Sequence, residues 1–207
     1  MTVRIGHTTT SGTFSLDGKT ILVDNNAWIV GDEHECVVID APHDGSAILD
    51  VVSGRQVLAI LLTHGHDDHL GAVGSLWDAT GAQIFLHPAD RMLWDRVYPG
   101  VAPDAHLVDG KTLTVGGEDL HVLHTPGHTP GSVCFYLPSA NAVFTGDTLI
   151  RGGAGSTGGS FSDSGALARS IQDRLLTLPP DTTVYPGHGD TTTITAESAP
   201  GRAATSA

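Results

Sequence analysis

The sequence predicts an α/β protein in which two sheets stack face to face and helices cover both outer faces, a four-layer αββα sandwich. Short β-type runs alternate with helical segments along the chain, and the order from strands to helices occurs twice. Residues 58–62 are apolar without alternation, which is typical of a strand covered on both faces. Together these observations indicate two similar halves, each a sheet with helices on one side.

The length and composition favour one globular domain. We predict that residues 1–197 form it and that the small, polar residues 198–207 form a flexible tail. The formal net charge of -13 argues against nucleic acid and anionic membranes as partners, because both attract basic proteins. No secretory signal and no apolar run of about 20 residues is present, so we expect a cytoplasmic protein.

The first half contains four β-type runs, at residues 20–23, 27–30, 36–39 and 57–62. A helix is expected over residues 44–52, because Asp44 can cap its start and Gly54 follows its end. Beyond the fourth strand, the pattern predicts a helix at 69–80, a strand at 83–86 and a helix at 88–96.

The second half repeats this order, with strands at 107–108, 112–115, 120–123, 132–137 and 142–145 and a helix at 164–176. The Gly- and Ser-rich residues 151–164 between them form either a flexible linker or a substrate-facing loop. Cys36 and Cys134 lie in apolar stretches, where we expect buried, reduced thiols.

A dense cluster of histidines and carboxylates follows the strand at 57–62. His64 and His66 are two apart, so in an extended segment both side chains can face one ion. Asp68 and His69 begin the next helix and can face a second ion, while Gly65 lets the backbone turn tightly.

Three single candidates follow later strands, and each is weak evidence alone. His128 lies between Pro-Gly turns, Asp147 follows an apolar strand, and His188 stands in a Pro-Gly-His-Gly turn. The combined set of five imidazoles and two carboxylates suits two borderline divalent ions. The other histidines match no ligand pattern and are assigned structural or surface roles, with His87 expected to lie nearest the site.

Four motifs resemble those of the metallo-β-lactamase superfamily and, within it, of the glyoxalase II group: Thr63-His64-Gly65-His66-Asp67-Asp68-His69, Pro126-Gly127-His128-Thr129-Pro130-Gly131, Gly146-Asp147-Thr148-Leu149 and Pro186-Gly187-His188-Gly189. The resemblance extends over nearly the whole chain. It implies that the first metal is bound by His64, His66 and His128, the second by Asp68, His69 and His188. It further implies that Asp147 bridges them, and that the ions are zinc, with iron or manganese as alternatives.

The resemblance implies hydrolysis of a small-molecule thioester of a low-molecular-weight thiol by a metal-bridging hydroxide. Asp68 would then also act in catalysis, as a proton acceptor and donor. Only 19 residues follow His188, so the chain resembles the short bacterial form without a C-terminal helical domain. The group commonly has a Gly-Arg pair where this chain has Gly158-Gly159, which leaves Arg151 and Arg169 as the candidate substrate-binding residues.

Other functions share this ligand set. In related persulfide dioxygenases one iron is held by residues matching His64, His128 and Asp147, and lactonases share the fold. A nuclease is disfavoured by the negative charge. A metal-binding protein without catalysis is a further alternative, and the oligomeric state stays open.

Overall fold

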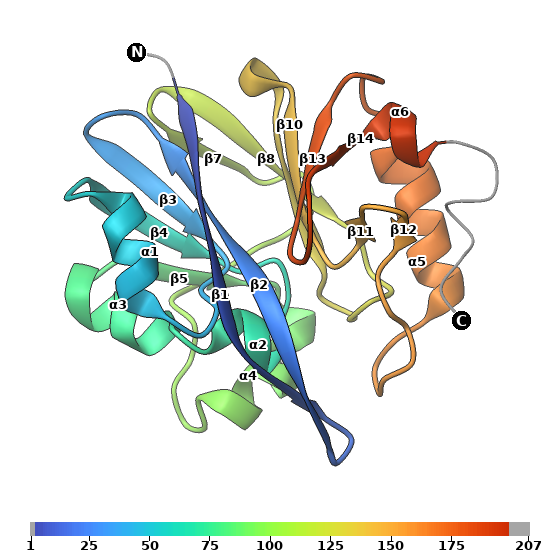
Figure 1. The fold of residues 1–207 in the computed structure, drawn as a ribbon, viewed down its shortest axis with the longest axis horizontal. Helices are drawn as coiled ribbons and strands as arrows, with labels where there is room; N and C mark the ends of the chain where they lie inside the picture. The colour runs from blue at the N-terminus through green and yellow to red at the C-terminus, as the bar shows by residue number, and fades with distance from the viewer. Residues whose placement is uncertain (1–2, 199–207) are drawn as a thin grey trace.

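The computed structural model describes residues 3–198, and within them the predicted four-layer sandwich is confirmed (Figure 1). One six-stranded sheet comes from the first half, in the spatial order β1 (Arg4–Leu16), β2 (Lys19–Gly31), β3 (Glu35–Ile39), β4 (Gln56–Leu61), β5 (Gln83–Leu86) and β6 (Ala105–His106). The other comes from the second half, in the order β14 (Thr192–Thr193), β13 (Thr183–Pro186), β10 (Ala142–Gly146), β9 (Val133–Leu137), β8 (Glu118–His124) and β7 (Thr112–Val115).

The helices lie on the outer faces of the two sheets. The helices of the first half are α1 (Gly45–Val52), α2 (Asp67–Leu70), α3 (Val73–Thr80), η1 (Pro88–Asp90) and α4 (Arg91–Val97). Those of the second half are η2 (Pro138–Ala140), α5 (Ser164–Ser170), η3 (Ile171–Leu175) and α6 (Ile194–Glu197). A small two-stranded sheet of β11 (Leu149–Ile150) and β12 (Gly153–Ala154) lies between β10 and α5 in the chain.

Three clusters of buried apolar side chains fill the three interfaces between the four layers. Strand β3 shows how one strand serves two of them, because successive side chains point to opposite faces. Cys36 and Val38 pack under the helices, whereas Val37 and Ile39 pack against the second sheet. Cys36 and Cys134 are both buried free thiols, as predicted.

The N-terminal hairpin differs from the sequence prediction. Strand β1 was not predicted, because its residues are largely polar and exposed and gain their order from pairing with β2. The two runs expected at 20–23 and 27–30 form one strand, β2, that continues through a polar stretch. The hairpin turns at Asp17 and Gly18, whose φ angles of 52° and 74° match a primed two-residue turn.

Three predicted helices are interrupted. The helix expected at 69–80 divides into α2 and α3, the helix at 88–96 begins as the 3-10 turn η1, and the helix at 164–176 ends in the π-helical η3. The tail predicted at 198–207 lies outside the described residues apart from Ser198, which follows α6. No helix between residues 3 and 198 is long and apolar enough to cross a membrane.

Candidate metal centre

All seven predicted ligands converge at one edge of the stacked sheets. Each lies on a segment that follows a strand: His64, His66, Asp68 and His69 after β4, His128 after β8, Asp147 after β10 and His188 after β13. Strands β4, β10 and β13 are buried at the ends that these segments follow, and the fold brings distant parts of the chain to one place. The cluster therefore contains residues from both halves.

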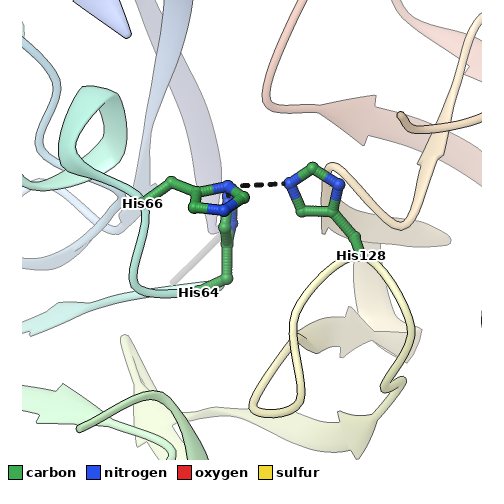
Figure 2. A group of neighbouring side chains, drawn as sticks. All are labelled: His64, His66 and His128. Carbon is green, nitrogen blue, oxygen red and sulfur yellow. Dashed lines mark hydrogen bonds between the residues drawn. The ribbon is translucent and has the colours of Figure 1, made fainter. Parts of the chain in front are cut away.

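Three histidines form a first group (Figure 2). The Nδ1 atom of His66 lies 3.1 Å from Nε2 of His64 and 3.0 Å from Nε2 of His128. The three residues are between 1% and 6% exposed. Their ring nitrogens thus point at one shared position that is shielded from solvent.

A second group consists of Asp68, His69 and His188. Oδ2 of Asp68 lies 3.4 Å from Nε2 of His188 and 3.7 Å from Nε2 of His69. Asp68 and His69 are buried, whereas the side chain of His188 is 26% exposed. This group differs from the first in containing a carboxylate and in reaching the surface.

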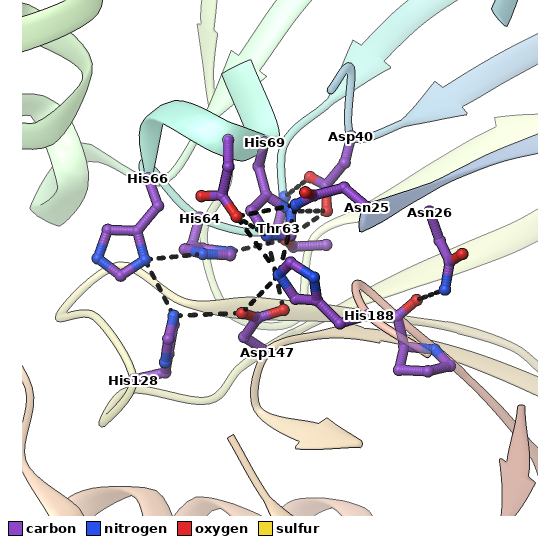
Figure 3. A network of polar contacts seen from close by, with 12 residues as sticks. Asn25, Asn26, Asp40, Thr63, His64, His66, His69, His128, Asp147 and His188 are labelled. Atoms are coloured by element: carbon purple, nitrogen blue, oxygen red, sulfur yellow. Dashed lines mark hydrogen bonds and ion pairs between the residues drawn. The ribbon is translucent and has the colours of Figure 1, made fainter. Parts of the chain in front are cut away.

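Asp147 lies between the two groups (Figure 3). Its Oδ2 atom is 3.6 Å from Nε2 of His128 and 3.3 Å from Nε2 of His188, and its Oδ1 atom is 3.6 Å from Nε2 of His69. One carboxylate therefore faces nitrogens of both groups, which is the position that a bridging ligand requires.

Burial and charge set opposite protonation states in the two groups. Burial holds the pKa of His64 well below its usual value and lowers the pKa of His66 to about 3, so both imidazoles are neutral near pH 7. Burial also disfavours a charged His188, but the Asp147 carboxylate outweighs it and raises the pKa of His188 to about 10. Likewise, burial opposes ionisation of Asp68, yet His69 and the hydrogen bonds from His188 and Asn25 lower the pKa of Asp68 to about 2.

The donor set fits divalent metal ions. Asp68 Oδ1, His69 Nε2 and Asp147 Oδ1 are buried and have no hydrogen-bond partner among residues 3–198. Buried polar atoms are almost always paired, so three such donor atoms in one cluster fit the binding of a cation. Imidazole nitrogens and carboxylate oxygens are the donors that zinc and iron accept.

The rear nitrogens of His64, His128 and His188 are fixed by neighbours, as is usual for metal-binding histidines. Nδ1 of His128 donates to the backbone oxygen of Ser156 at 2.7 Å, and Nδ1 of His188 donates to that of Asp24 at 2.7 Å. Nδ1 of His64 lies 3.0 Å from the Thr63 hydroxyl. These contacts direct Nε2 of each ring towards the cluster.

Asp40 is a positioning residue that the sequence prediction missed. Its carboxylate accepts hydrogen bonds from the Thr63 amide, the Thr63 hydroxyl and Nδ1 of His69, each at 2.8 Å. Its backbone φ of 58° is rare for a residue other than glycine. Asp40 follows the buried strand β3 just as Asp147 follows β10, and this shared position was the available signal.

The polar stretch of β2 supports the second group. Nδ2 of Asn25 donates to Oδ2 of Asp68 at 2.9 Å, and Oδ1 of Asn25 lies 2.9 Å from Nε2 of His43. Nδ2 of Asn26 donates to two backbone oxygens that flank His188, those of Pro186 and Gly189. These asparagines interrupt the apolar pattern because they bind the ligand loops.

Among the histidines without a ligand motif, His43 rather than His87 contacts the site, through Asn25. His87 instead stacks on His124, with ring centroids 4.2 Å apart, and lines a separate cavity. Burial lowers the pKa of His87 to about 4. The expectation that His87 would lie nearest the metal centre was therefore wrong.

A cavity of about 290 Å³ opens beside the cluster. Its walls combine metal-centre residues with side chains from the hairpin, β11 and the Gly- and Ser-rich stretch, including Phe14, Ile21, Val23, Ile150 and Ser156. The Gly- and Ser-rich stretch thus borders the site. Neither candidate arginine lines this cavity, since Arg151 pairs with Asp190 at 2.8 Å and Arg169 is exposed on α5.

Comparisons with known proteins identify the family of this chain. A family model described as the metallo-beta-lactamase superfamily matches residues 20–188. A Mycobacterium tuberculosis protein of uncharacterised function is 44% identical over 192 residues, which cover 79% of this chain and 84% of that protein. The hydroxyacylglutathione hydrolase GloC of Haemophilus influenzae is 32% identical over 192 residues, which cover 84% of this chain and 90% of that enzyme.

Solved structures are similar over nearly the whole chain. The BLEG-1 B3 metallo-beta-lactamase superposes with a TM-score of 0.78 at 32% identity and covers 91% of this chain and 96% of its own. TTHA1623 in a di-iron-bound form superposes with a TM-score of 0.73 at 36% identity, and the match covers 92% of this chain and 97% of TTHA1623. ETHE1 from Myxococcus xanthus superposes with a TM-score of 0.75 at 28% identity, and the match covers 95% of this chain and 86% of ETHE1.

Proposed function

Because this chain belongs to the metallo-β-lactamase superfamily, we propose that it hydrolyses thioesters of a low-molecular-weight thiol. The observation that carries this proposal is the complete pair of ligand groups with Asp147 between them. The similarity to a hydroxyacylglutathione hydrolase supports the thioester as substrate.

We assign His64, His66 and His128 to one ion and Asp68, His69 and His188 to the other, with Asp147 shared. Zinc fits these donors, and iron or manganese fit them as well. When bound, two such ions polarise a carbonyl and make water nucleophilic near neutral pH. A serine or cysteine nucleophile is then not required.

The chain itself supplies proton transfer through Asp68. Its low pKa keeps this carboxyl ionised, and Asn25 fixes its Oδ2 atom. Asp68 can accept a proton from the attacking water and pass it to the departing sulfur. A carbon–oxygen bond forms, the carbon–sulfur bond breaks, and the products are a carboxylic acid and a free thiol.

The size and lining of the cavity suit a small acyl group. Its volume of about 290 Å³ lies at the lower end of the range for pockets that hold small molecules. Phe14, Ile21 and Val23 make its hairpin wall apolar and limit the access of water to the thioester carbon. The thiol portion of the substrate would extend beyond this cavity.

The test is thiol release from lactoyl thioesters of glutathione, bacillithiol and mycothiol, assayed side by side. Zinc-, manganese- and iron-loaded protein is compared with metal-free protein and with His128→Ala as the matched control. We expect cleavage of at least one thioester by loaded parent protein and little by either control. Absence of cleavage above the metal-free rate for all three thioesters would refute the proposal.

A persulfide dioxygenase is the second candidate, and the similarity to ETHE1 favours it. His64 shares one candidate ligand group with His128 and another with Asp147, and these three residues would provide the two histidines and one carboxylate that suit a single iron. Oxygen uptake by the iron-loaded protein with glutathione persulfide separates the two reactions. Uptake without thioester cleavage would establish oxidation in place of hydrolysis.

A further inference from the structure

Asp90 is a fully buried carboxylate at the end of η1 that contacts none of the seven ligand side chains through a hydrogen bond. Its Oδ2 atom accepts hydrogen bonds from the Gly65 amide at 2.8 Å and from the Thr129 hydroxyl at 2.7 Å. Its Oδ1 atom accepts one from the Gly131 amide at 2.6 Å. Three donors from two separate loops thus converge on one side chain.

These two loops carry the whole of the first ligand group. Gly65 stands between His64 and His66, and Thr129 directly follows His128. The loops belong to different sheets, so Asp90 connects the two halves of the molecule beneath this group.

Close packing makes this connection rigid. A Cβ atom on Gly65 would lie 3.1 Å from Cβ of Asp90 and 2.9 Å from Cβ of Leu93, and one on Gly131 would lie 2.6 Å from Cγ of Asp90. Glycine is therefore required at both positions for the backbone to reach the carboxylate.

We propose that Asp90 is a positioning residue that sets the metal affinity of the His64, His66 and His128 group by holding the separation of its two loops. The second group has different supports, since Asn25 holds Asp68, Asp40 holds His69 and the Asp24 backbone oxygen holds His188. The effect of Asp90 is accordingly confined to the first group. This inference rests on the metal assignment in the proposed function and is independent of the substrate.

The test is Asp90→Asn, measured by zinc titration against a competing chelator with no substrate present. The amide has one acceptor oxygen, and its NH2 group would face an N–H donor, so the loops must shift. The substitution is made in two backgrounds, His69→Ala, which retains the first group, and His66→Ala, which retains the second. We expect zinc affinity to fall about 10- to 100-fold in the first background and to stay within about twofold in the second.

Asp32→Asn is the matched control. Asp32 is also a buried carboxylate, and it accepts the His34 and Glu35 amides at 2.7 and 2.9 Å at the far end of β3 from the site. The Asp32→Asn substitution should lower the melting temperature of the metal-free protein without changing zinc affinity in either background. If Asp90→Asn reduces zinc affinity equally in both backgrounds, or in neither, the proposal is overturned.

Should Asp90→Asn fail to fold, Thr129→Val removes one donor to Asp90, together with the 2.8 Å contact between the Thr129 and Ser132 hydroxyls, and keeps the side-chain volume similar. It should weaken zinc binding in the His69→Ala background and leave it unchanged in the His66→Ala background. Cobalt loaded in place of zinc provides an independent reading, because its visible absorption responds to ligand geometry. An unchanged cobalt spectrum together with unchanged zinc affinity in Thr129→Val would also contradict the role of Asp90.

Discussion

The two ligand groups share an edge of the fold but differ in charge. The first consists of three imidazoles, of which His64 and His66 are kept neutral by burial. The second contains Asp68 and two histidines whose pKa values are raised, in spite of burial, by nearby carboxylates. The first group is thus ready to bind a cation, whereas the second holds protons that a cation must displace.

This difference shows that the two ligand groups are prepared for metal binding in different ways. Burial keeps His64 and His66 of the first group neutral, and the spacing of their loops matters because this group has no carboxylate besides the Asp147 that it shares with the second group. Carboxylates prepare the second group and stabilise its histidines as cations until metal arrives.

The largest effect is expected from Asp147→Ala, which removes a carboxylate that faces nitrogens of both groups. The two ions would lose a shared ligand and the negative charge that offsets their repulsion. We expect metal content to fall below two ions per chain. Activity should fall by more than the roughly 100-fold loss that is typical when a residue hydrogen-bonded to a metal ligand is replaced. Metal analysis after desalting measures this, and a variant that still binds two ions would show that the bridge is elsewhere.

Asp40→Asn should affect the second group next most strongly. The amide retains one acceptor for Thr63 but cannot serve both Thr63 and His69 as the carboxylate does. We expect about a 10- to 100-fold loss of zinc affinity in the His66→Ala background, measured by chelator competition. A loss of zinc affinity confined instead to the His69→Ala background would show that Asp40 supports the first ligand group rather than the second.

The pH dependence of metal binding should differ between the groups. His188 has a pKa of about 10, so near pH 7 it is protonated in the metal-free protein, and affinity at the second group should rise about tenfold per pH unit for each proton displaced. His66 has a pKa of about 3, so it releases no proton above about pH 4. Calorimetry in buffers of different ionisation enthalpy counts these protons. Equal proton release in the two single-group backgrounds would show that the contrast in charge is wrong.

Arg151→Ala should have the smallest effect. The pair that it forms with Asp190 is exposed, and such pairs contribute about 0 to 1 kcal/mol. We expect unchanged metal content and a melting temperature within about 2 °C of the parent. A raised KM for the thioester with unchanged kcat would instead support the predicted role of Arg151 in substrate binding.

The sequence predicted most of the layers because its apolar runs and turn residues follow the periods of strands and helices. The ligands His64, His66, Asp68 and His69 were predicted because they lie close together on one segment. Asp147 and His188 were predicted through the motifs around them, and the structure places both in the cluster. Local patterns were sufficient wherever neighbouring residues share a role.

Residues that act through tertiary contacts were not predictable in this way. Asp90 is one acidic residue at the start of a helix, and its three donors lie on loops far away in the chain. Asn25 and Asn26 suggested a break between strands, because asparagine is uncommon within them. They persist in β2 since they bind the ligand loops, and a polar residue that breaks a strand pattern is thus a sign of function.

Each ligand group draws side chains from both sheets, and this has a consequence for the lifetime of the folded protein. His66 and His128 meet only after the sheets have docked, as do Asp68 and His188. Bound ions therefore resist the separation of the two halves but cannot help either half to form first. Removing them with a chelator should speed unfolding in denaturant while the rate of refolding stays the same.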